Sequence, residues 1–479
     1  MRKFLLSLSV VLCVCLSVYA QRAKKPKLPP SKSKQIHTFI STIHQDGQFS
    51  GALLVAEQGR LIYKKAFGYA NRQTEELFTN QTPCYIGSIS KQFTAMGIMV
   101  LQECGKLNYN QSIRSFFPDL PPCMQPVTVL HLLRHTGGLA LFGDYPDMNE
   151  QDVFNMLAKQ ESLRFSPGDK FEYCNAGYTL LGMIIEKVSG ESLNDFLTTN
   201  IFVPIGMKNT YVNSMALSDR KRAIGYYIFG DENNYDTFIG GSASVVSTIE
   251  DMYKWDKALA NPTIVSKKTL AKAFEADKLT SQDEMYGAKG YGFGWFVSQK
   301  NAKKIVQHDG GFGGFRSYIE RQPEQQNTII FISNVRHSIT GQIREGINNI
   351  LEGKPYTIPK NSWANKLIER ANSIGMANAI AEYKRTKNTD EGRSYYFNES
   401  EFNSLGYYLM RNKRIEDAIK FFVLNTEENP TSANAFDSLG EAYQNAGMKE
   451  SSEQSYKKSR ELSEARSSTQ KTSEKITKQ

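Results

Sequence analysis

Cysteine and histidine are scarce in this chain of 479 residues, with six of each. None of them falls at the spacing of a zinc site, so the sequence predicts no bound metal, and nothing in it calls for a cofactor. Hydrophobic residues make up 40% and charged residues 22%, which is a globular composition rather than a disordered or fibrous one. A chain of this length exceeds one ordinary hydrophobic core, so about two to three domains are expected.

Acidic residues are absent from the first forty positions. That stretch holds eight basic residues, and the net charge of the whole chain is +9, which leaves +1 for residues 41–479. A body so close to neutral disfavours a broad basic surface, and nucleic acid is therefore not expected as a partner.

Long apolar runs are also missing beyond the N-terminus. Arg2 and Lys3 precede an apolar run from Phe4 to Tyr19, and the small residue Ala20 follows. This order is typical of a secretory signal peptide over 1–20. The alternative is a membrane anchor, but the run is short for a span of roughly 20 residues. We therefore expect a secreted or periplasmic protein that is not an integral membrane protein after cleavage.

Four cysteines follow this leader: Cys84, Cys104, Cys123 and Cys174. An oxidising compartment permits disulfides, but four cysteines allow three pairings and spacing does not choose among them. Residues 21–35 are basic and contain proline, and they are predicted to form a solvated linker.

Strand patterns lie at both ends of the region 36–355, with helical patterns between them. Residues 51–56 and 61–67 flank Glu57-Gln58-Gly59-Arg60, which is a hairpin signature. Further strands are predicted at 291–297, 304–307, 315–320 and 328–333, and helices near 36–45, 88–104, 127–134, 179–188 and 340–351. This order predicts an α+β fold, in which an antiparallel β-sheet flanked by helices is closed by segments distant in the chain and carries a helical insert.

A repeat follows in the polar, helical segment after residue 355. Ser404-Leu405-Gly406 recurs 34 residues later as Ser438-Leu439-Gly440, and Phe422 and Tyr456 share the same offset. This period is typical of tetratricopeptide repeats, which the sequence 432–447 resembles. We expect an α-helical repeat module over 356–463 and a disordered polar tail over 464–479. Such repeats either present a concave surface to a protein partner or pack as an appendage.

The motif with the clearest chemistry is Ser88-Ile89-Ser90-Lys91. Ser-x-x-Lys also occurs at four other positions, and a serine is a preferred helix cap, so the tetrapeptide alone is weak. Only Ser88 opens a long apolar helix, where a serine and a lysine three residues apart share one face. A lysine of lowered pKa can remove the hydroxyl proton, and the helix N-terminus favours a developing negative charge.

Two further motifs carry polar groups suited to the same chemistry. Tyr173-Cys174-Asn175 precedes an apolar helix, where a phenol can shuttle a proton and an amide can bridge the lysine and a substrate carbonyl. His308-Asp309-Gly310-Gly311 ends a predicted strand, and an N–H near Gly311 could join the Ser88 N–H in an oxyanion hole. A rival histidine motif is His135-Thr136-Gly137, whose glycine is interpreted as a helix stop. His308 is preferred because it lies beside an extended strand that can hold substrate.

In their order along the chain, these three motifs resemble those of the serine β-lactamase and penicillin-binding-protein superfamily. The nearest branch is the class C β-lactamase-like one, with its D-Ala-D-Ala carboxypeptidases, D-amino-acid peptidases and esterases. The resemblance covers about 36–355 and includes the segments 132–139, 167–190, 202–210 and 240–255. It implies the following roles: Ser88 as the acylated nucleophile, Lys91 as the base, Tyr173 as a proton relay, Asn175 as a contact of substrate and lysine, and His308, Gly310 and Gly311 as substrate-binding residues.

One departure narrows the function. His308 stands where class C β-lactamases have lysine, which resembles the carboxypeptidase and esterase members and disfavours efficient antibiotic hydrolysis. Cys174 is interpreted as a packing residue, with a redox pairing to Cys84 as the alternative.

The sequence thus favours an exported serine hydrolase that forms an acyl-enzyme on Ser88. Its substrates would be esters, amides or D-amino-acid peptides, peptidoglycan-derived ones included. The alternative is a catalytically weak or inactive binding or sensor protein that uses its repeats for protein–protein interaction.

Overall fold

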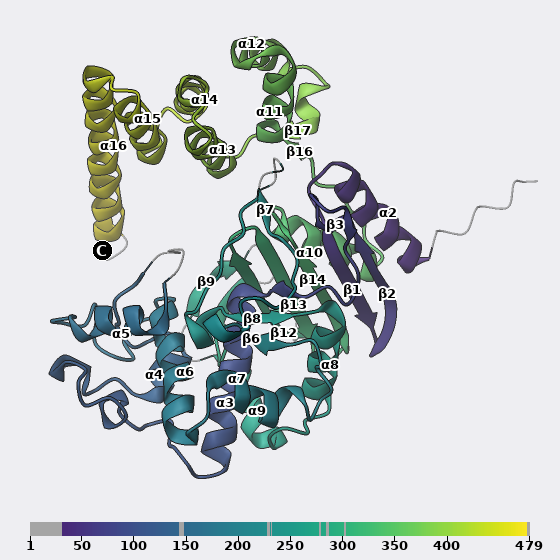
Figure 1. Ribbon diagram of the computed structural model, residues 1–479, viewed down its shortest axis with the longest axis vertical. Helices are drawn as coiled ribbons and strands as arrows, with labels where there is room; N and C mark the ends of the chain where they lie inside the picture. Colours follow the sequence, from purple (N-terminus) through teal and green to yellow (C-terminus); the bar gives the residue numbers. More distant parts are fainter. Residues whose placement is uncertain are drawn as a thin grey trace, which may run out of the picture.

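A β-sheet body and a row of helices above it make up the computed structural model of this protein (Figure 1). The structure describes residues 31–142, 148–227, 230, 232–276, 279–283, 287–300 and 303–476. The predicted signal peptide and most of the predicted linker lie outside these residues.

The described part of the body is built on an eight-stranded sheet with the order β2-β1-β14-β13-β12-β11-β10-β9, in which every neighbouring pair is antiparallel. The strands are β1 Gly51–Glu57, β2 Arg60–Phe67, β9 Leu279–Asp283, β10 Gly287–Tyr291, β11 Phe296–Lys300, β12 Lys303–Phe312, β13 Phe315–Gln322 and β14 Asn327–Ser333. Because β1 pairs with β14 from Gly51–Ser333 to Ala56–Thr328, the two ends of the body lie side by side in one sheet. This confirms the predicted α+β fold.

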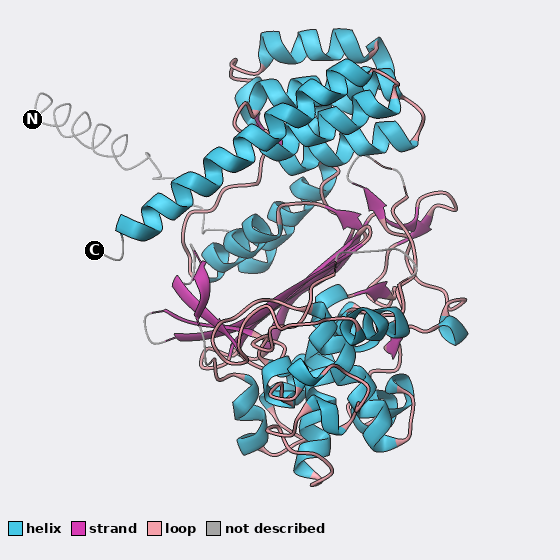
Figure 2. Cartoon of the chain, turned by 90° about the vertical axis from the view of Figure 1, so that its left-hand side faces the viewer, coloured by secondary structure: helices cyan, strands magenta, loops and turns pink. Residues whose placement is uncertain are grey.

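Helices cover both faces of the sheet (Figure 2). The helices α2 Lys32–Gln45 and α10 Thr340–Leu351 pack on one face, where Leu53, Val55 and Phe331 point. The opposite face bears the insert, and Leu54 and Ile330 belong to its core. The strands therefore alternate between two cores. The insert and the following segment contain α3 Ser90–Glu103, α4 Val129–Leu133, α5 Glu150–Ala158, α6 Asn175–Ser189, α7 Leu193–Leu197, α8 Ile249–Ala260 and α9 Lys267–Ala273.

Short strand pairs fasten the loops of the body. They are β3 Tyr69–Asn71 with β4 Glu76–Leu77, β8 Val245–Ser247 between β5 Cys84–Tyr85 and β6 Tyr211–Val212, and β7 Tyr226–Tyr227 with β15 Val335–Arg336. In the region above the body, β16 Asn361–Ser362 pairs with β17 Tyr395–Tyr396.

Three predicted elements have different bounds. The predicted strand 291–297 is two strands, because the chain turns between them at Gly292, where an added Cβ would lie 2.1 Å from the Ala273 carbonyl oxygen, and at Gly294, whose φ is +78°. Strand β12 extends to Phe312, so the His308 motif lies inside a strand and not at its end. Ser88 lies in a 3₁₀ turn, η1 Gly87–Ile89, that leads into α3.

The helices above the body share a core of their own. They are α11 Trp363–Ile374, α12 Met376–Thr386, α13 Glu399–Arg411, α14 Ile415–Glu428, α15 Ala433–Asn445 and α16 Lys449–Ile476. A Cβ on Gly406 would lie 2.4 Å from the Phe422 ring, and one on Gly440 would lie 2.8 Å from the Tyr456 ring. The same close contact between a helix glycine and an aromatic ring thus occurs twice, 34 residues apart. The assignment to tetratricopeptide repeats stays a prediction.

The segment 464–479 was expected to be disordered. In the structure, helix α16 runs to Ile476 and so covers most of that segment. No proline or glycine interrupts this polar segment, so the helix can propagate from the part that packs on α15. All four described cysteines are free thiols, so the alternative of a Cys84–Cys174 disulfide is not realised in this structure. Among the described residues no helix has the length and apolarity to cross a membrane.

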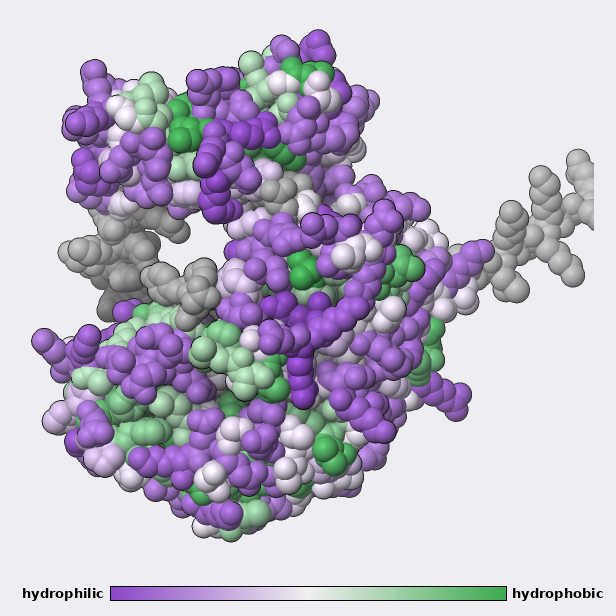
Figure 3. Space-filling model, viewed as in Figure 1, coloured by the Kyte–Doolittle hydropathy of each residue, from purple (hydrophilic) through white to green (hydrophobic). Residues whose placement is uncertain are grey.

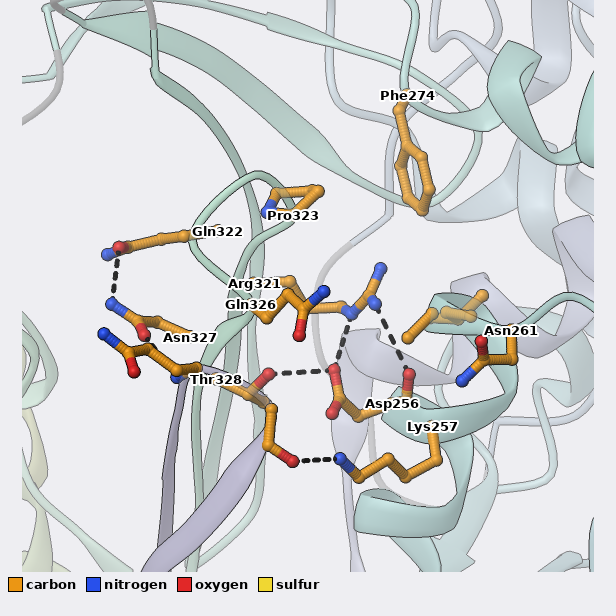
Figure 4. Close-up of a pocket in the computed structure, with 14 residues that line it drawn as sticks. Asp256, Lys257, Asn261, Phe274, Arg321, Gln322, Pro323, Gln326, Asn327 and Thr328 are labelled. Atoms are coloured by element: carbon orange, nitrogen blue, oxygen red, sulfur yellow. Dashed lines mark hydrogen bonds and ion pairs between the residues drawn. The ribbon is translucent and has the colours of Figure 1, made fainter.

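A buried ion pair fastens α8 to the face of the sheet that bears the insert. The Arg321 guanidinium donates to Asp256 Oδ1 at 2.6 Å, and the Thr328 hydroxyl donates to the same oxygen at 2.9 Å. Both charged side chains are 6% exposed, and they line a polar cavity of about 410 Å³ (Figure 4). Arg321, Asp256 and Thr328 form hydrogen bonds with one another, so this cavity is interpreted as part of the packing and not as a ligand site.

Replacement of Arg321 by Met leaves the Asp256 carboxylate buried and unpaired. We expect a loss of about 3–5 kcal/mol in the free energy of unfolding, measured by urea denaturation. The double variant Arg321→Met, Asp256→Leu removes both charges and should be less destabilised than the single variant. Equal losses in the two variants would contradict a tight ion pair.

Candidate active site

Ser88 sits where the first turn of α3 meets the sheet. Gly87 has a φ of +52°, and a Cβ on it would lie 2.7 Å from the Gly311 nitrogen on β12. The Ser317 hydroxyl donates to the Ile86 carbonyl at 2.8 Å, which fastens the turn from the neighbouring strand. The glycine is required because any side chain there would push the serine away from β12.

Lys91 lies beneath Ser88 and is fully buried. Its Nζ donates to Ser88 Oγ at 3.1 Å, to Asn175 Oδ1 at 2.8 Å and to the Ser242 carbonyl at 2.9 Å. These three acceptors are uncharged, and a buried ammonium depends on such hydrogen bonds. The geometry aims the amine at the serine hydroxyl, as a general base requires.

Asn175 and Ser242 reach the lysine from two different elements. Asn175 is the first residue of α6, which places it in a helix and not in the preceding loop. Ser242 ends the 3₁₀ turn η6 Gly240–Ser242, where a Cβ on Gly241 would lie 2.6 Å from the Tyr178 carbonyl oxygen. Thr94 on α3 donates to the Gly241 carbonyl at 2.8 Å. The turn is therefore wedged between α3 and α6. Ser242 lies in the segment 240–255 that resembles the family, but the sequence assigned it no role at the lysine.

Tyr173 lies over the lysine, with its ring centre 4.8 Å from Lys91 Nζ. Burial raises the pKa of the Tyr173 phenol well above its usual value, and the Ser88 hydroxyl opposes that shift. The phenol is therefore neutral at physiological pH, and it can give a proton to a leaving group.

His135 belongs to the site, although the sequence favoured His308 alone. Its ring centre lies 4.3 Å from that of Tyr173, and its Nδ1 accepts the Cys174 N–H at 3.0 Å. Its carbonyl oxygen accepts the Glu172 N–H at 2.9 Å. His135 itself, and not Gly137, takes the left-handed conformation after α4, with a φ of +57°. A strained non-glycine residue is frequent at functional sites, and this one holds the loop that carries Tyr173.

His308 points to the same side and is 2% exposed. Its Nε2 lies 3.0 Å from the Tyr291 hydroxyl and its Nδ1 lies 2.6 Å from the Asp309 carbonyl oxygen. Burial lowers the pKa of His308 to about 4, with the Asp309 carboxylate opposing the shift and the Lys91 ammonium adding to it. The imidazole is therefore uncharged at neutral pH.

Gly310 allows the strand and the nucleophile to approach each other. A Cβ on Gly310 would lie 2.0 Å from the Ile86 carbonyl oxygen. The ladder between β11 and β12 ends at Phe296–Gln307, so it leaves His308 to Phe312 at an edge. Substrate backbone can pair with such an edge. Because a Cβ on Gly87 would lie 2.7 Å from the Gly311 nitrogen, the N–H groups of Ser88 and Gly311 belong to adjoining backbone segments and can serve one oxyanion.

The fold and this cluster define a serine hydrolase of the β-lactamase and penicillin-binding-protein type. The Beta-lactamase family model matches residues 36–352, so the chain belongs to that family.

Individual relatives agree with this assignment. The chain is 32% identical over 361 residues to Penicillin-binding protein 4* of Bacillus subtilis (strain 168), which covers 69% of this chain and 78% of that protein. It is 27% identical to Protein flp of Staphylococcus aureus (strain MW2), covering 69% of each.

Among solved structures, the octameric penicillin-binding protein homologue from Pyrococcus abyssi matches with a TM-score of 0.61 and 28% identity, over 71% of this chain and 81% of that one. EstCE1, a hydrolase with promiscuous acyltransferase activity, shares the fold with a TM-score of 0.58 at 22% identity, over 67% of this chain and 98% of that one.

Replacement of His135 by Leu should lower kcat about tenfold, because the Cys174 N–H loses its acceptor and the Tyr173 loop loosens. An Asn at this position tolerates a positive φ and offers an acceptor, so His135→Asn should retain more of kcat. Steady-state kinetics on one activated ester separates kcat from KM. A positioning role is contradicted if both variants change KM alone.

The burial of His308 makes the stability of the fold depend on pH. The pKa of His308 is lowered to about 4, so the folded chain binds fewer protons than the unfolded chain between pH 6.5 and about 4. The free energy of unfolding should therefore fall by roughly 2–4 kcal/mol for this group as the pH drops through that window. Urea denaturation at about pH 7 and about pH 4.5 should show a smaller drop for His308→Gln than for wild type.

Proposed function

We propose that this protein is an exported serine hydrolase that acts through an acyl-enzyme on Ser88. The observation that carries the proposal is the 3.1 Å contact between Ser88 Oγ and the fully buried Nζ of Lys91. A structural lysine would gain nothing from burial beside a serine, since a buried charge is costly unless it is paired.

The first half of the reaction acylates the serine. As Ser88 Oγ attacks the carbonyl carbon, its proton passes to the neutral form of Lys91, and the N–H groups of Ser88 and Gly311 receive the oxyanion. The C–O or C–N bond to the leaving group then breaks, and Tyr173 gives its proton to the departing oxygen or nitrogen. Lys91 reprotonates the phenol of Tyr173, whose ring centre lies 4.8 Å from Lys91 Nζ.

The second half releases the acyl group with water. The water loses a proton to the Tyr173 and Lys91 pair as its oxygen attacks the ester carbon, and Ser88 regains its proton as the acyl bond breaks. Asn175 Oδ1 holds the Lys91 amine at 2.8 Å throughout both halves.

Esters, amides and D-amino-acid peptides are the proposed substrate class. The neutral His308, held by Tyr291 at 3.0 Å, offers no positive charge where a lysine would. This favours carboxypeptidase or esterase chemistry over β-lactam hydrolysis. The leader at 1–20 supports export to the periplasm or the medium.

A fluorophosphonate probe should label the protein on Ser88, because such probes trap activated serines. Ser88→Ala should abolish labelling and lower ester turnover by about 10³-fold or more. Ser218→Ala is the matched control, since Ser218 and Lys221 form the same tetrapeptide pattern in an exposed loop. Equal labelling of both variants, read by gel fluorescence and intact mass, would refute the proposal.

A fluorescent penicillin distinguishes a protein that reacts with β-lactams from one with esterase or peptidase chemistry alone. Labelling by the phosphonate without labelling by penicillin favours esterase or peptidase chemistry. Absence of labelling by either probe in the wild type would favour the alternative of a binding or sensor protein.

A further inference from the structure

Tyr291 is the last residue of β10, and its side chain lies among the rings of the candidate active site with 1% of its surface exposed. The hydroxyl lies 3.0 Å from His308 Nε2. The ring centre lies 4.6 Å from that of His135 and 4.9 Å from that of Phe296, which meets it edge-on. The proton transfers proposed above do not use this phenol, although it lies beside the groups that carry them out.

The two ring nitrogens of His308 face different partners, and these decide which nitrogen carries the proton. Nδ1 lies 2.6 Å from the carbonyl oxygen of Asp309, which is an acceptor only. Nδ1 is therefore protonated, because two lone pairs would repel each other at this distance. Burial lowers the pKa of His308 to about 4, so the ring is neutral at pH 7 and has a single proton. Nε2 is then an acceptor.

The Tyr291 hydroxyl is consequently the donor in its contact with Nε2. Burial raises the pKa of Tyr291 well above its usual value, so the phenol keeps the proton that it donates. Tyr178, which interacts with Tyr291, gives its own proton to the Leu133 carbonyl at 2.8 Å. His308 thus has a protein partner at both nitrogens, and it has no N–H left to offer a substrate.

The charged groups near His308 oppose a positive charge on its ring. Lys91 of α3 and Lys289 of β10 both lower the pKa of His308, whereas the Asp309 carboxylate raises it. A protonated His308 would be a third cation beside these two lysines. The hydrogen bond from Tyr291 adds to the opposition, because it stabilises the neutral form of the ring.

The side chains around His308 make an uncharged wall beside the free edge of β12. Its ring centre lies 5.2 Å from that of Phe296 and 6.1 Å from that of Tyr173. Burial keeps Tyr173 protonated and His135 neutral. Hydrophobic residues also gather on the surface of the body around α4 to α6, before and after the Tyr173 loop, whereas the helices above are mostly hydrophilic (Figure 3). A carboxylate brought to this wall would lose water and gain neither a donor nor a cation from His308.

We propose that Tyr291 is a positioning residue that holds His308 as the neutral Nδ1–H tautomer, so that the candidate active site selects uncharged esters and amides over substrates with a free carboxylate beside the scissile bond. Tyr291 acts through His308 and not on the substrate. The inference rests on the proposed hydrolase function and narrows its substrate class, since the substrate of a carboxypeptidase carries such a carboxylate.

Nuclear magnetic resonance of the full chain tests the tautomer directly. The chain has six histidines, so ¹⁵N labelling of histidine gives few signals, and His308→Gln identifies the signal of His308. In wild type, Nδ1 should be protonated and Nε2 should show the shift of an acceptor. In Tyr291→Phe the pKa of His308 should rise by about one pH unit, because the neutral ring loses a donated hydrogen bond. Protonation of Nε2 in wild type, or an unchanged pKa in the variant, would overturn the proposal.

Paired esters measure the selection by charge. The pairs are 4-acetoxybenzoate with its methyl ester, and the p-nitrophenyl monoester of glutarate with its methyl-capped analogue. At pH 7, wild type should favour the uncharged member of at least one pair by about tenfold in kcat/KM, which also identifies the side of the scissile bond that faces His308. At pH 5 this ratio should fall in Tyr291→Phe and hold in wild type, because His308 gains charge there only in the variant. Since the same two substrates are compared in both proteins, their own ionisation cancels.

Tyr109→Phe is the matched control for the loss of a buried hydroxyl. The Tyr109 hydroxyl has no hydrogen-bond partner within the described residues, so this variant should keep the wild-type pKa of His308 and the wild-type ester ratio. Lys289→Gln tests the competing cation, whose ammonium lies 4.3 Å from the ring centre of Phe296. A wild type that prefers the charged esters, with that preference lost in Lys289→Gln, would overturn the proposal and assign the selection to this lysine.

The outcomes separate this inference from the proposed function. A wild type that hydrolyses the esters with a ratio near one would overturn the selection and leave the hydrolase function intact. A wild type that hydrolyses none of them would count against the proposed function and against the selection together, and the resonance measurement then decides whether Tyr291 fixes the tautomer of His308.

Discussion

The burial of the Lys91 ammonium beside Ser88 is the constraint on which the body of this protein depends. An ammonium in a dry interior is costly unless its hydrogens are satisfied, so three separate elements have to deliver acceptors to one point. The turn η1 brings Ser88, the start of α6 brings Asn175 and the turn η6 brings the Ser242 carbonyl. The close packing of Gly241 between α3 and α6 follows from the same demand, because any larger residue would move that carbonyl away.

A second constraint comes from the strand beside the serine. Gly87 and Gly310 have no side chains to separate η1 from β12, and each added Cβ would come within 2.7 Å of a backbone atom across that contact. The backbone of β12 is therefore held against the nucleophile, which is what an oxyanion hole made of main-chain N–H groups requires. The unpaired end of β12 results from the turn at Gly292 and Gly294, so the break that shortens β10 and β11 also opens the edge where substrate can bind.

The sequence predicted the parts of the site that lie close together along the chain. Ser88 and Lys91 share a helical turn, and the order of hairpin, helices and late strands was enough to predict the sheet. Ser242 and His135 were not predicted as site residues, because each acts through a backbone or ring contact that exists only after α3, α4 and α6 have packed. The boundary of the 291–297 strand was also wrong, since an apolar pattern with glycines does not show whether the chain extends or turns. These contacts are tertiary, so no local pattern in the sequence indicates them.

The helices above the body are held in a fixed position relative to the sheet. A flexible tether would leave the Glu401 carboxylate exposed, whereas here it is 8% exposed and bonded to hydroxyls of both parts. Burying a carboxylate at an interface costs free energy unless its oxygens are satisfied, so the bonds from Ser338 and Tyr396 tie the orientation of α13 to the stability of the contact. Ser338 lies in the short segment between β15 and α10, so this one stretch of the body anchors α13.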